Sequence, residues 1–297
     1  MPETIYDLRE LLRALGTVDL ISSLGSAPGG REMPEHPAIL LETDPQPVTA
    51  DPLDVTCFVD GVQSSLSLTH REWRPVHLIY VAAGALGAEG HVYGVRERLT
   101  IVASALDAQW ARDLPGGVPV LELDEESPFS LGSAGVRELA GARDALEREL
   151  VDDLVEEDVG VIVVDGSIVG RDVSTSVVGI SKTTATRYLA DESVLLGLEE
   201  GWRSPRFVIP AGVGGGHVPR ASCYVRLRGS RNRGWDYGLV RIEALDADLL
   251  DGFAARCLAE RQPRGNADLR GDRHLSSIAS VEIFLRARRP HLFDRAL

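Results

Sequence analysis

Two aspartates occupy the same local setting in the sequence, and side chains of this type and pattern can bind metal ions. Asp60 lies in CFVDGV and Asp165 lies in VVDGSI, so each follows an apolar run and precedes a glycine. Each pattern predicts a strand that ends at a sharp turn, with the carboxylate at the rim of a sheet. A single Asp-Gly pair would indicate only a turn, whereas two in the same setting favour a site. If the two strands are neighbours, the carboxylates repel one another unless a cation lies between them, and hard divalent ions take such oxygen ligands.

A third carboxylate is expected from the helix that precedes the second aspartate, because a pair of metals that cleaves a phosphodiester needs further oxygen ligands. Residues 133–155 carry apolar side chains at helical spacing, and Glu147 and Glu149 flank that stripe. Val151 extends the stripe towards Glu147, which favours Glu147 as the glutamate that points at the sheet. Glu149 stays open as the alternative, and so does a surface position for both.

Two further residues are candidates for the same chemistry. His274, in GDRHLSS, comes at the expected start of the last helix, where it could ligate a metal or transfer a proton. Asp272 in the same segment would cap that helix or act as a secondary ligand. Lys182 is the single lysine in a chain whose other cationic side chains are all arginine. A compact ammonium group suits a phosphate, so Lys182 joins the predicted catalytic residues.

The charge of the chain is unevenly distributed. With 31 basic and 45 acidic residues the net charge is −14, which by itself argues against a nucleic-acid partner. Residues 202–241, however, contain eight arginines and one aspartate, a net charge of +7. Within this block the residues predicted to contact DNA phosphates are Arg226, Arg228, Arg231 and Arg233. The alternative interpretation is a solvated loop region in an arginine-rich protein.

The elements that must position these residues follow the order strand, strand, strand, helix, strand. Apolar, β-rich runs near Val55, at 76–86 and at 96–106 predict a three-stranded antiparallel meander. The helix of residues 133–155 leads into GVIVVDGS, a continuous apolar run that is typical of a strand buried on both faces. This order, with an aspartate after the first and fourth strands, predicts an α/β fold: a ribonuclease H-like mixed sheet flanked by helices.

Shorter patterns predict the remaining elements. They indicate strands at VVGISK, SCYVRLRG and YGLVRIEAL, and helices at 246–260 and 274–288. Residues 211–219, AGVGGGHVP, contain too much glycine for a regular element and are interpreted as a mobile loop in a loop-rich insertion. Residues 1–50 are predicted to form an extension with an amphipathic helix at 3–16 and a loop, ahead of a single domain at 51–297.

Composition excludes several classes of protein. Hydrophobic residues make up 44% and charged residues 26% of the chain, which is typical of a globular protein. No run of eighteen apolar residues exists, and the acidic start is not that of a signal peptide, so neither a membrane span nor secretion is expected. The three cysteines, Cys57, Cys223 and Cys257, are far apart, which favours reduced thiols in a cytoplasm over disulfides or a zinc site.

Taken together, these motifs resemble the NurA family of DNA-end-processing nucleases. The resemblance covers roughly residues 50–290 and rests on FVDG, a helix with LE ahead of VVDGSI, the GISK and YVRL segments, and a late histidine. It implies that Asp60, Glu147, Asp165 and His274 bind Mn²⁺ or Mg²⁺ and cut DNA. It also implies a homodimer that docks on a HerA-type hexameric ATPase for end resection, as a 5′–3′ exonuclease or single-strand endonuclease. The sequence departs from the family at Val62, where the first motif usually has serine.

Two other functions remain open. A NurA-like subunit that has lost cleavage could act as an adaptor of an ATPase complex, and the missing serine and acidic charge favour that alternative. An actin- or hexokinase-like phosphotransferase also uses Asp-Gly turns at strand ends, but the chain is short for a duplicated fold. Cleavage of labelled DNA in the presence of manganese would separate the nuclease from both alternatives.

Overall fold

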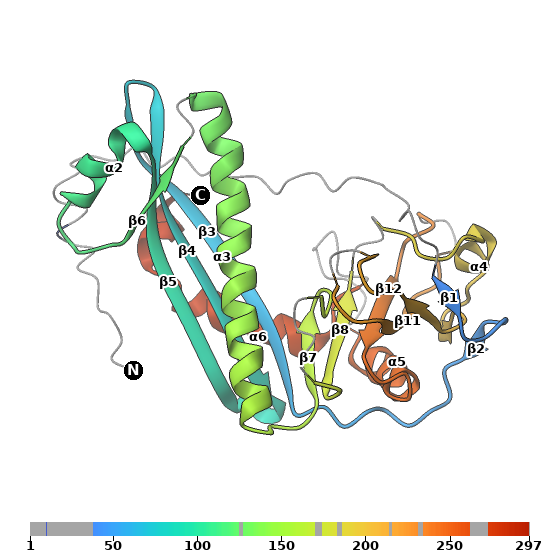
Figure 1. Cartoon of the computed structure of the whole chain (residues 1–297). Helices are drawn as coiled ribbons and strands as arrows, with labels where there is room; N and C mark the ends of the chain where they lie inside the picture. The colour runs from blue at the N-terminus through green and yellow to red at the C-terminus, as the bar shows by residue number, and fades with distance from the viewer. Residues whose placement is uncertain are drawn as a thin grey trace.

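The computed structural model describes residue 10 and residues 38–296, with gaps at 125–126, 170–173, 183–185, 214–215, 231–233 and 262–272. In this part of the chain, one mixed sheet of twelve strands has helices on both faces, so the predicted α/β class is confirmed (Figure 1). The main strand order is β1-β10-β11-β12-β8-β7-β3-β4-β5-β6, and β9 pairs with β2 and β11 beside it. The helix predicted at 3–16 lies outside the described residues, apart from Glu10.

Three long strands form the predicted antiparallel meander: β3 (Cys57–Arg71), β4 (Arg74–Gly87) and β5 (Val92–Ser104). The prediction that the first strand ends at an Asp-Gly turn is wrong, because Asp60 pairs with Gly84 and Gly61 with Ala83 inside β3 and β4. Gly61 instead allows a close approach. A Cβ at position 61 would lie 2.4 Å from Glu147 Oε1, so the glycine makes room for a neighbouring side chain.

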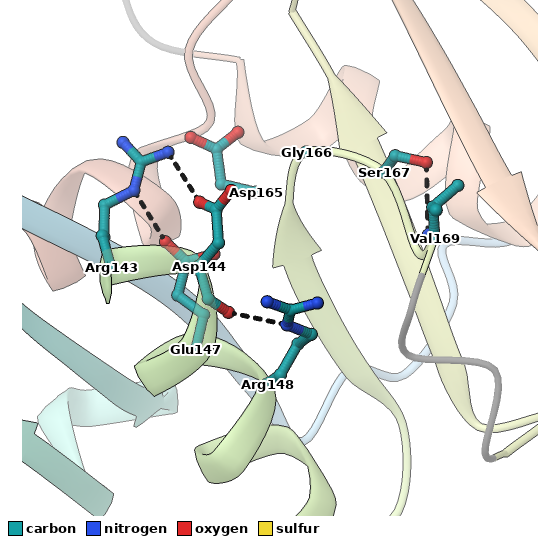
Figure 2. A pocket seen from close by; sticks show the side chains of 8 residues that line it. All are labelled: Arg143, Asp144, Glu147, Arg148, Asp165, Gly166, Ser167 and Val169. Carbon is teal, nitrogen blue, oxygen red and sulfur yellow. Dashed lines mark hydrogen bonds and ion pairs between the residues drawn. The ribbon is translucent and has the colours of Figure 1, made fainter. Parts of the chain in front are cut away.

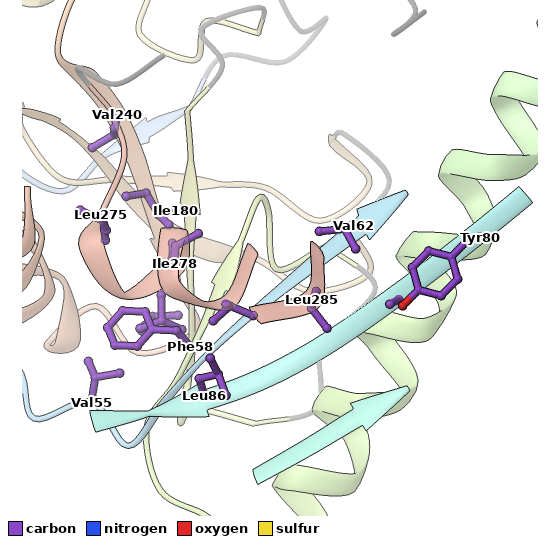
Figure 3. Packing of buried hydrophobic residues seen from close by; sticks show 14 of the residues in the cluster. Val55, Phe58, Val62, Tyr80, Leu86, Ile180, Val240, Leu275, Ile278 and Leu285 are labelled. Carbon is purple, nitrogen blue, oxygen red and sulfur yellow. The ribbon is translucent and has the colours of Figure 1, made fainter. Parts of the chain in front are cut away.

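Helices cover the two faces of the meander. Helix α3 (Pro128–Glu156) lies along the strands on one face, as Figure 1 shows, and confirms the helix predicted at 133–155. Helix α6 (Ser276–Arg288) packs on the other face, where Ile278 and Leu285 join the core with Phe58 and Val62 (Figure 3). Because strand side chains alternate between faces, Asp60 points to the same face as Phe58 and Val62.

The strands that follow α3 extend the sheet beyond β3. Strand β7 (Ile162–Asp165) lies parallel to both β3 and β8 (Val177–Ser181), as expected for an apolar run buried on both faces. Strands β12 (Leu239–Ala244) and β11 (Arg220–Arg226) continue it in antiparallel pairs. Helix α5 (Leu249–Glu260) confirms the helix predicted at 246–260.

Several elements were not predicted from the sequence. Helix α2 (Ala105–Arg112) and strand β6 (Val120–Leu123) follow β5, and β6 pairs with it in parallel. The other short elements are η1 (Ala88–Gly90), α4 (Glu192–Leu196) and η3 (His291–Ala296). Elements of this length carry too little periodicity to be recognised in a sequence. No helix in the described part of the chain has the length and apolar character that a membrane crossing requires.

Part of the predicted N-terminal extension belongs to the sheet. Strands β1 (Ile39–Leu40) and β2 (Gln46–Pro47) pair with β10 (Phe207–Ile209) and β9 (Trp202–Arg203). The boundary predicted at residue 50 therefore does not separate these strands from the rest. The described residues of the predicted glycine-rich loop, 211–213 and 216–219, form turns and no strand.

Candidate functional site

The two predicted aspartates come together on adjacent parallel strands. The register of β3 and β7 pairs Val59 with Val164, so Asp60 and Asp165 are the next residues on neighbouring strands. Both side chains point to the face that Phe58 and Val163 share, because alternation along each strand is the same. Asp165 ends β7, and Gly166 follows with a φ of 108°, a backbone conformation that suits glycine. Of the two predicted Asp-Gly turns, this one is confirmed.

The surroundings of Asp60 disfavour its negative charge. The residue is only 8% exposed, and one carboxylate oxygen accepts a 2.8 Å hydrogen bond from Gly61 N. Burial and the nearby carboxylate of Asp165 raise the pKa of Asp60 well above its ordinary range, and Glu147 adds to this effect while Lys182 opposes it. Asp60 is therefore a buried acid among like charges, an arrangement typical of functional sites.

Lys182 supplies the cation nearest to the second aspartate. It follows β8, and its Nζ lies 2.8 Å from Asp165 Oδ2. The ammonium group is nearly buried, whereas about a quarter of the Asp165 side chain, 26%, is exposed. The side chain of the only lysine thus contacts Asp165 directly and acts on Asp60 through its charge, which agrees with its inclusion among the predicted site residues.

Helix α3 contributes Glu147 and not Glu149. Glu147 is 5% exposed and approaches β3 over Gly61, where the missing side chain leaves space for its carboxylate. Glu149 lies two residues further round the helix, with a side chain 52% exposed and 3.6 Å from Arg98 Nη2 on the surface. Successive helical residues are about 100° apart, so residues two apart cannot share a face. The choice that the sequence left open is resolved in favour of Glu147.

A cleft of about 360 Å³ opens beside these carboxylates, between α3 and the segment after β7 (Figure 2). The lining residues are Arg143, Asp144, Glu147, Arg148, Asp165, Gly166, Ser167 and Val169. Arg143 Nε lies 3.3 Å from Glu147 Oε1, which partly compensates that carboxylate. Arg148 is exposed, and its Nε donates to Asp144 O at 3.2 Å. Among the described residues no carboxylate forms an ion pair with Arg148, so its guanidinium can meet an anion.

The two cleft arginines were missed by the sequence analysis. Arg143 and Arg148 lie four residues before and one residue after Glu147 on the same helix. Helical spacing of i and i+4 places Arg143 beside Glu147, so the signal was present once Glu147 had been chosen. This signal was not used in the prediction because acidic residues outnumber the three arginines of the helix.

His274 lies just before α6. The sequence predicts His274 in the first turn of this helix. The helix instead begins at Ser276 with Leu275 as its N-cap, so His274 lies just outside it. The preceding residue, Arg273, donates from Nη1 to Lys182 O at 2.8 Å, which brings this segment to the end of β8. His274 is 9% exposed. Asp272 lies outside the described residues, so its predicted capping or ligand role stays a prediction.

The oxygen atoms at this site are of the type that a hard divalent cation binds, but the side chains that carry them are not grouped as the ligands of one ion. Asp60, Asp165 and Glu147 supply carboxylate oxygens, which Mn²⁺ and Mg²⁺ prefer. Among the described residues, no three side chains of His, Cys, Asp or Glu converge closely enough to form a metal centre. Lys182 and Arg143 provide the compensating positive charge instead. The raised pKa of Asp60 indicates that this compensation is incomplete.

The two predicted DNA-contacting arginines that the structure describes, Arg226 and Arg228, are buried and do not form a basic surface. Arg226 is fully buried, and its guanidinium donates to four backbone carbonyl oxygens, those of Leu195, Leu198, Trp235 and Tyr237. Arg228 is only 6% exposed. Burial disfavours phosphate contact by both residues, and four hydrogen bonds give Arg226 a structural role instead. Arg231 and Arg233 lie outside the described residues, and their role stays a prediction.

Comparisons with known proteins add no family to this geometry. No protein-family model matches the chain, and no curated protein matches it significantly.

Proposed function

We propose that this protein is a metal-dependent nuclease that hydrolyses phosphodiester bonds of DNA, as the resemblance to the NurA family suggests. The observation that carries the proposal is that Asp60 and Asp165 lie next to each other on adjacent parallel strands, while Glu147 approaches over Gly61 and its charge acts on Asp60. Asp165 and Glu147 both contribute to the raised pKa of Asp60, and neighbouring carboxylates of this kind are a natural ligand set for a divalent cation.

The order of strands supports the more specific ribonuclease H-like assignment. The meander β3-β4-β5 is followed by α3 and by β7, which pairs with β3 in parallel, and β8 pairs with β7 in parallel. The strand order β5-β4-β3-β7-β8 puts Asp165, at the end of β7, beside Asp60, which lies near the beginning of β3. This is the arrangement expected if the first and fourth strands of such a fold carry the catalytic aspartates.

In this proposal Asp60, Asp165 and Glu147 would hold Mn²⁺ or Mg²⁺, with His274 as a further ligand. When bound, the metal supplies charge neutralisation at the scissile phosphate and a more acidic water. Lys182, which contacts Asp165, would stabilise negative charge on the attacking or the leaving oxygen of the phosphodiester. Arg148 at the cleft holds a neighbouring backbone phosphate, and Arg143 keeps Glu147 oriented.

A pair of variants on one helix tests the proposal. Full-length protein with Mn²⁺ should cut end-labelled linear DNA. Glu147→Gln, which removes a proposed ligand, should lose more in rate than the loss of about 10- to 100-fold that follows when a group orienting a ligand is removed. Glu149→Gln is the matched control, because it makes the same chemical change two residues away on the surface. Asp165→Asn should also be inactive. Full activity in Glu147→Gln or Asp165→Asn would reject the site.

The proposed partner is the one that the resemblance to the NurA family implies, and the charge of the chain agrees with it. With a net charge of −14 the protein holds DNA weakly by itself, which fits a nuclease that receives DNA from a HerA-type hexameric ATPase, as a homodimer. Cleavage should therefore be stimulated by such an ATPase at physiological salt.

A catalytically inactive adaptor is the second candidate. Its supporting observation is the Lys182–Asp165 ion pair, which occupies a carboxylate that the nuclease would use for metal. Wild-type protein that binds no Mn²⁺ and cuts no DNA, with and without the ATPase, would favour the adaptor.

A further inference from the structure

A buried group of charged side chains lies next to the candidate site, on strands that supply none of the predicted ligands. Glu243 of β12 is fully buried, and Arg220 and Arg241 are at most 5% exposed. Glu243 Oε1 lies 2.7 Å from Arg241 Nη2, and Glu243 Oε2 lies 3.3 Å from Arg220 Nε. Buried ion groups of this kind often stabilise a protein less than apolar side chains of the same volume. Their role is therefore better sought in what they hold in place.

The surroundings of Glu243 favour its ionised form. Burial alone would raise the pKa of its carboxyl group, but Arg241 and Arg220 outweigh that effect. Hydrogen bonds from Ser167 and from Ile168 N assist them, so the pKa lies below its ordinary value. A buried carboxylate is a strong acceptor, and its hydrogen bonds are shorter and stronger than those between neutral groups.

The segment after Asp165 crosses β8 to reach this carboxylate. Gly166 N donates to Ile180 O at 2.7 Å, which directs the chain over β8. The crossing passes over Gly179, the residue of β8 that pairs with Glu243. A Cβ at position 179 would lie 2.7 Å from Gly166 O and 2.9 Å from Ile168 Cγ2. The crossing therefore depends on glycine, because any side chain at position 179 would collide with backbone.

Two donors of the crossing segment meet Glu243. Ser167 Oγ donates to Glu243 Oε2 at 2.6 Å, and Ile168 N donates to the same oxygen at 3.3 Å. Val169 N in turn donates to Ser167 Oγ at 3.3 Å (Figure 2). Ser167 lines the cleft, yet its hydroxyl proton is held by Glu243. This hydroxyl is thus placed to anchor the segment and not to react.

We propose that Glu243 is a positioning residue, which holds the segment 166–168 through Ser167 and thereby fixes the Asp165 carboxylate beside Lys182. Asp165 is the residue immediately before the anchored segment, so release of the anchor lets its backbone and carboxylate move. The catalytic consequence rests on the proposed nuclease function, whereas the positioning itself does not. Groups that orient a metal ligand typically contribute 10- to 100-fold to metal affinity or activity.

Ser167→Ala is the main test because it removes one hydroxyl and leaves the buried ion group intact. Ser174→Ala is the matched control: Ser174 Oγ lies 2.7 Å from Ser176 Oγ in the same connection and has no hydrogen bond to Glu243. Ser167→Thr keeps the hydroxyl and should restore the wild-type behaviour. Glu243→Gln removes the acceptor charge, and its result is interpreted only if its thermal unfolding is cooperative.

Two measurements separate positioning from the proposed chemistry. The first is the NMR signal of lysine labelled with ¹³C at Cε, which gives a single resonance because Lys182 is the only lysine. It is recorded without metal. The second is Mn²⁺ affinity by titration calorimetry, together with kcat and KM on DNA.

Ser167→Ala should shift or broaden the Lys182 resonance and weaken Mn²⁺ binding about 10-fold, with kcat lowered more than KM is raised. Ser174→Ala and Ser167→Thr should change neither. A Lys182 resonance and an Mn²⁺ affinity equal to wild type in Ser167→Ala would overturn the proposal. If the wild-type protein binds no Mn²⁺ and cuts no DNA, the nuclease proposal fails, and the metal-free Lys182 resonance still decides whether Glu243 positions Asp165.

Discussion

The carboxylate site and the arginine-rich strands β11 and β12 are both charged and both buried, but they differ in how completely the charges are compensated. Asp60 has like-charged neighbours, and its pKa is raised by burial and by Asp165. Arg226 has four carbonyl partners, and Glu243 lies between two arginines that lower its pKa. Charge density alone therefore does not identify a functional site. An incompletely compensated buried charge does so better.

The largest expected effect is on stability, at Arg226. Arg226→Met keeps most of the apolar stem and removes the donors to four carbonyl groups in buried or part-buried hydrogen bonds, which should cost about 4 kcal/mol of unfolding free energy. Urea denaturation measures the change. Arg286→Met, at a surface position with a side chain 66% exposed, should change the unfolding free energy by less than about 0.5 kcal/mol. A mild effect at Arg226 would mean that these four hydrogen bonds contribute little to the stability of the protein.

Glu243→Gln should have the next largest effect, and the effect should depend on pH. Loss of the charge between Arg220 and Arg241 should destabilise the protein by about 3 kcal/mol at neutral pH. The folded-state pKa of Glu243 is lowered, so its stabilisation is present above the unfolded pKa of about 4.3 and is lost as pH falls through the folded value. Unfolding curves from pH 7 to pH 3 should show the gap between wild type and variant narrowing. A constant gap would contradict an ionised Glu243.

At the carboxylate site, removal of a charge is expected to raise the unfolding free energy rather than lower it. Asp60→Asn removes a negative charge that burial and Asp165 disfavour, while it keeps the shape of the side chain. Unfolding free energy in the presence of EDTA should rise by about 1 kcal/mol, although cleavage of DNA should be lost. Thermal unfolding and the nuclease assay on the same preparation provide the two readings. A less stable Asp60→Asn protein would mean that this carboxylate is compensated as fully as Glu243.

The smallest effect is expected at the cleft. Arg148→Gln should weaken DNA binding several-fold and reduce the slope of log affinity against log salt by about one, as for one lost phosphate contact. Arg112→Gln is the control, because Arg112 pairs with Glu122 on the surface of α2. Fluorescence anisotropy with catalytically inactive protein at several salt concentrations gives both slopes. Equal slopes for Arg148→Gln and wild type would remove this arginine from the DNA path.

Much of the fold was predictable because its signals are local and repeated. The apolar runs that became β3, β4, β5 and β7 are long enough to identify, and the stripe of α3 extends over many turns. Short elements such as α2, β1 and β6 were missed because a few residues carry no period. The buried face of each strand follows from alternation once its register is known, but register itself depends on partners distant in sequence.

The sequence by itself determined which side chains could do chemistry: two aspartates after apolar runs, a glutamate on an amphipathic helix and a single lysine. Only the tertiary structure decided which of the charged side chains have partners that compensate them. It brought Lys182 to Asp165 and turned Glu147 to the sheet and Glu149 to solvent. It also buried Arg226 among carbonyl groups that lie up to 31 residues away in the chain. The sequence gives the number and position of the charged residues. Their partners depend on packing between segments that are distant in the chain.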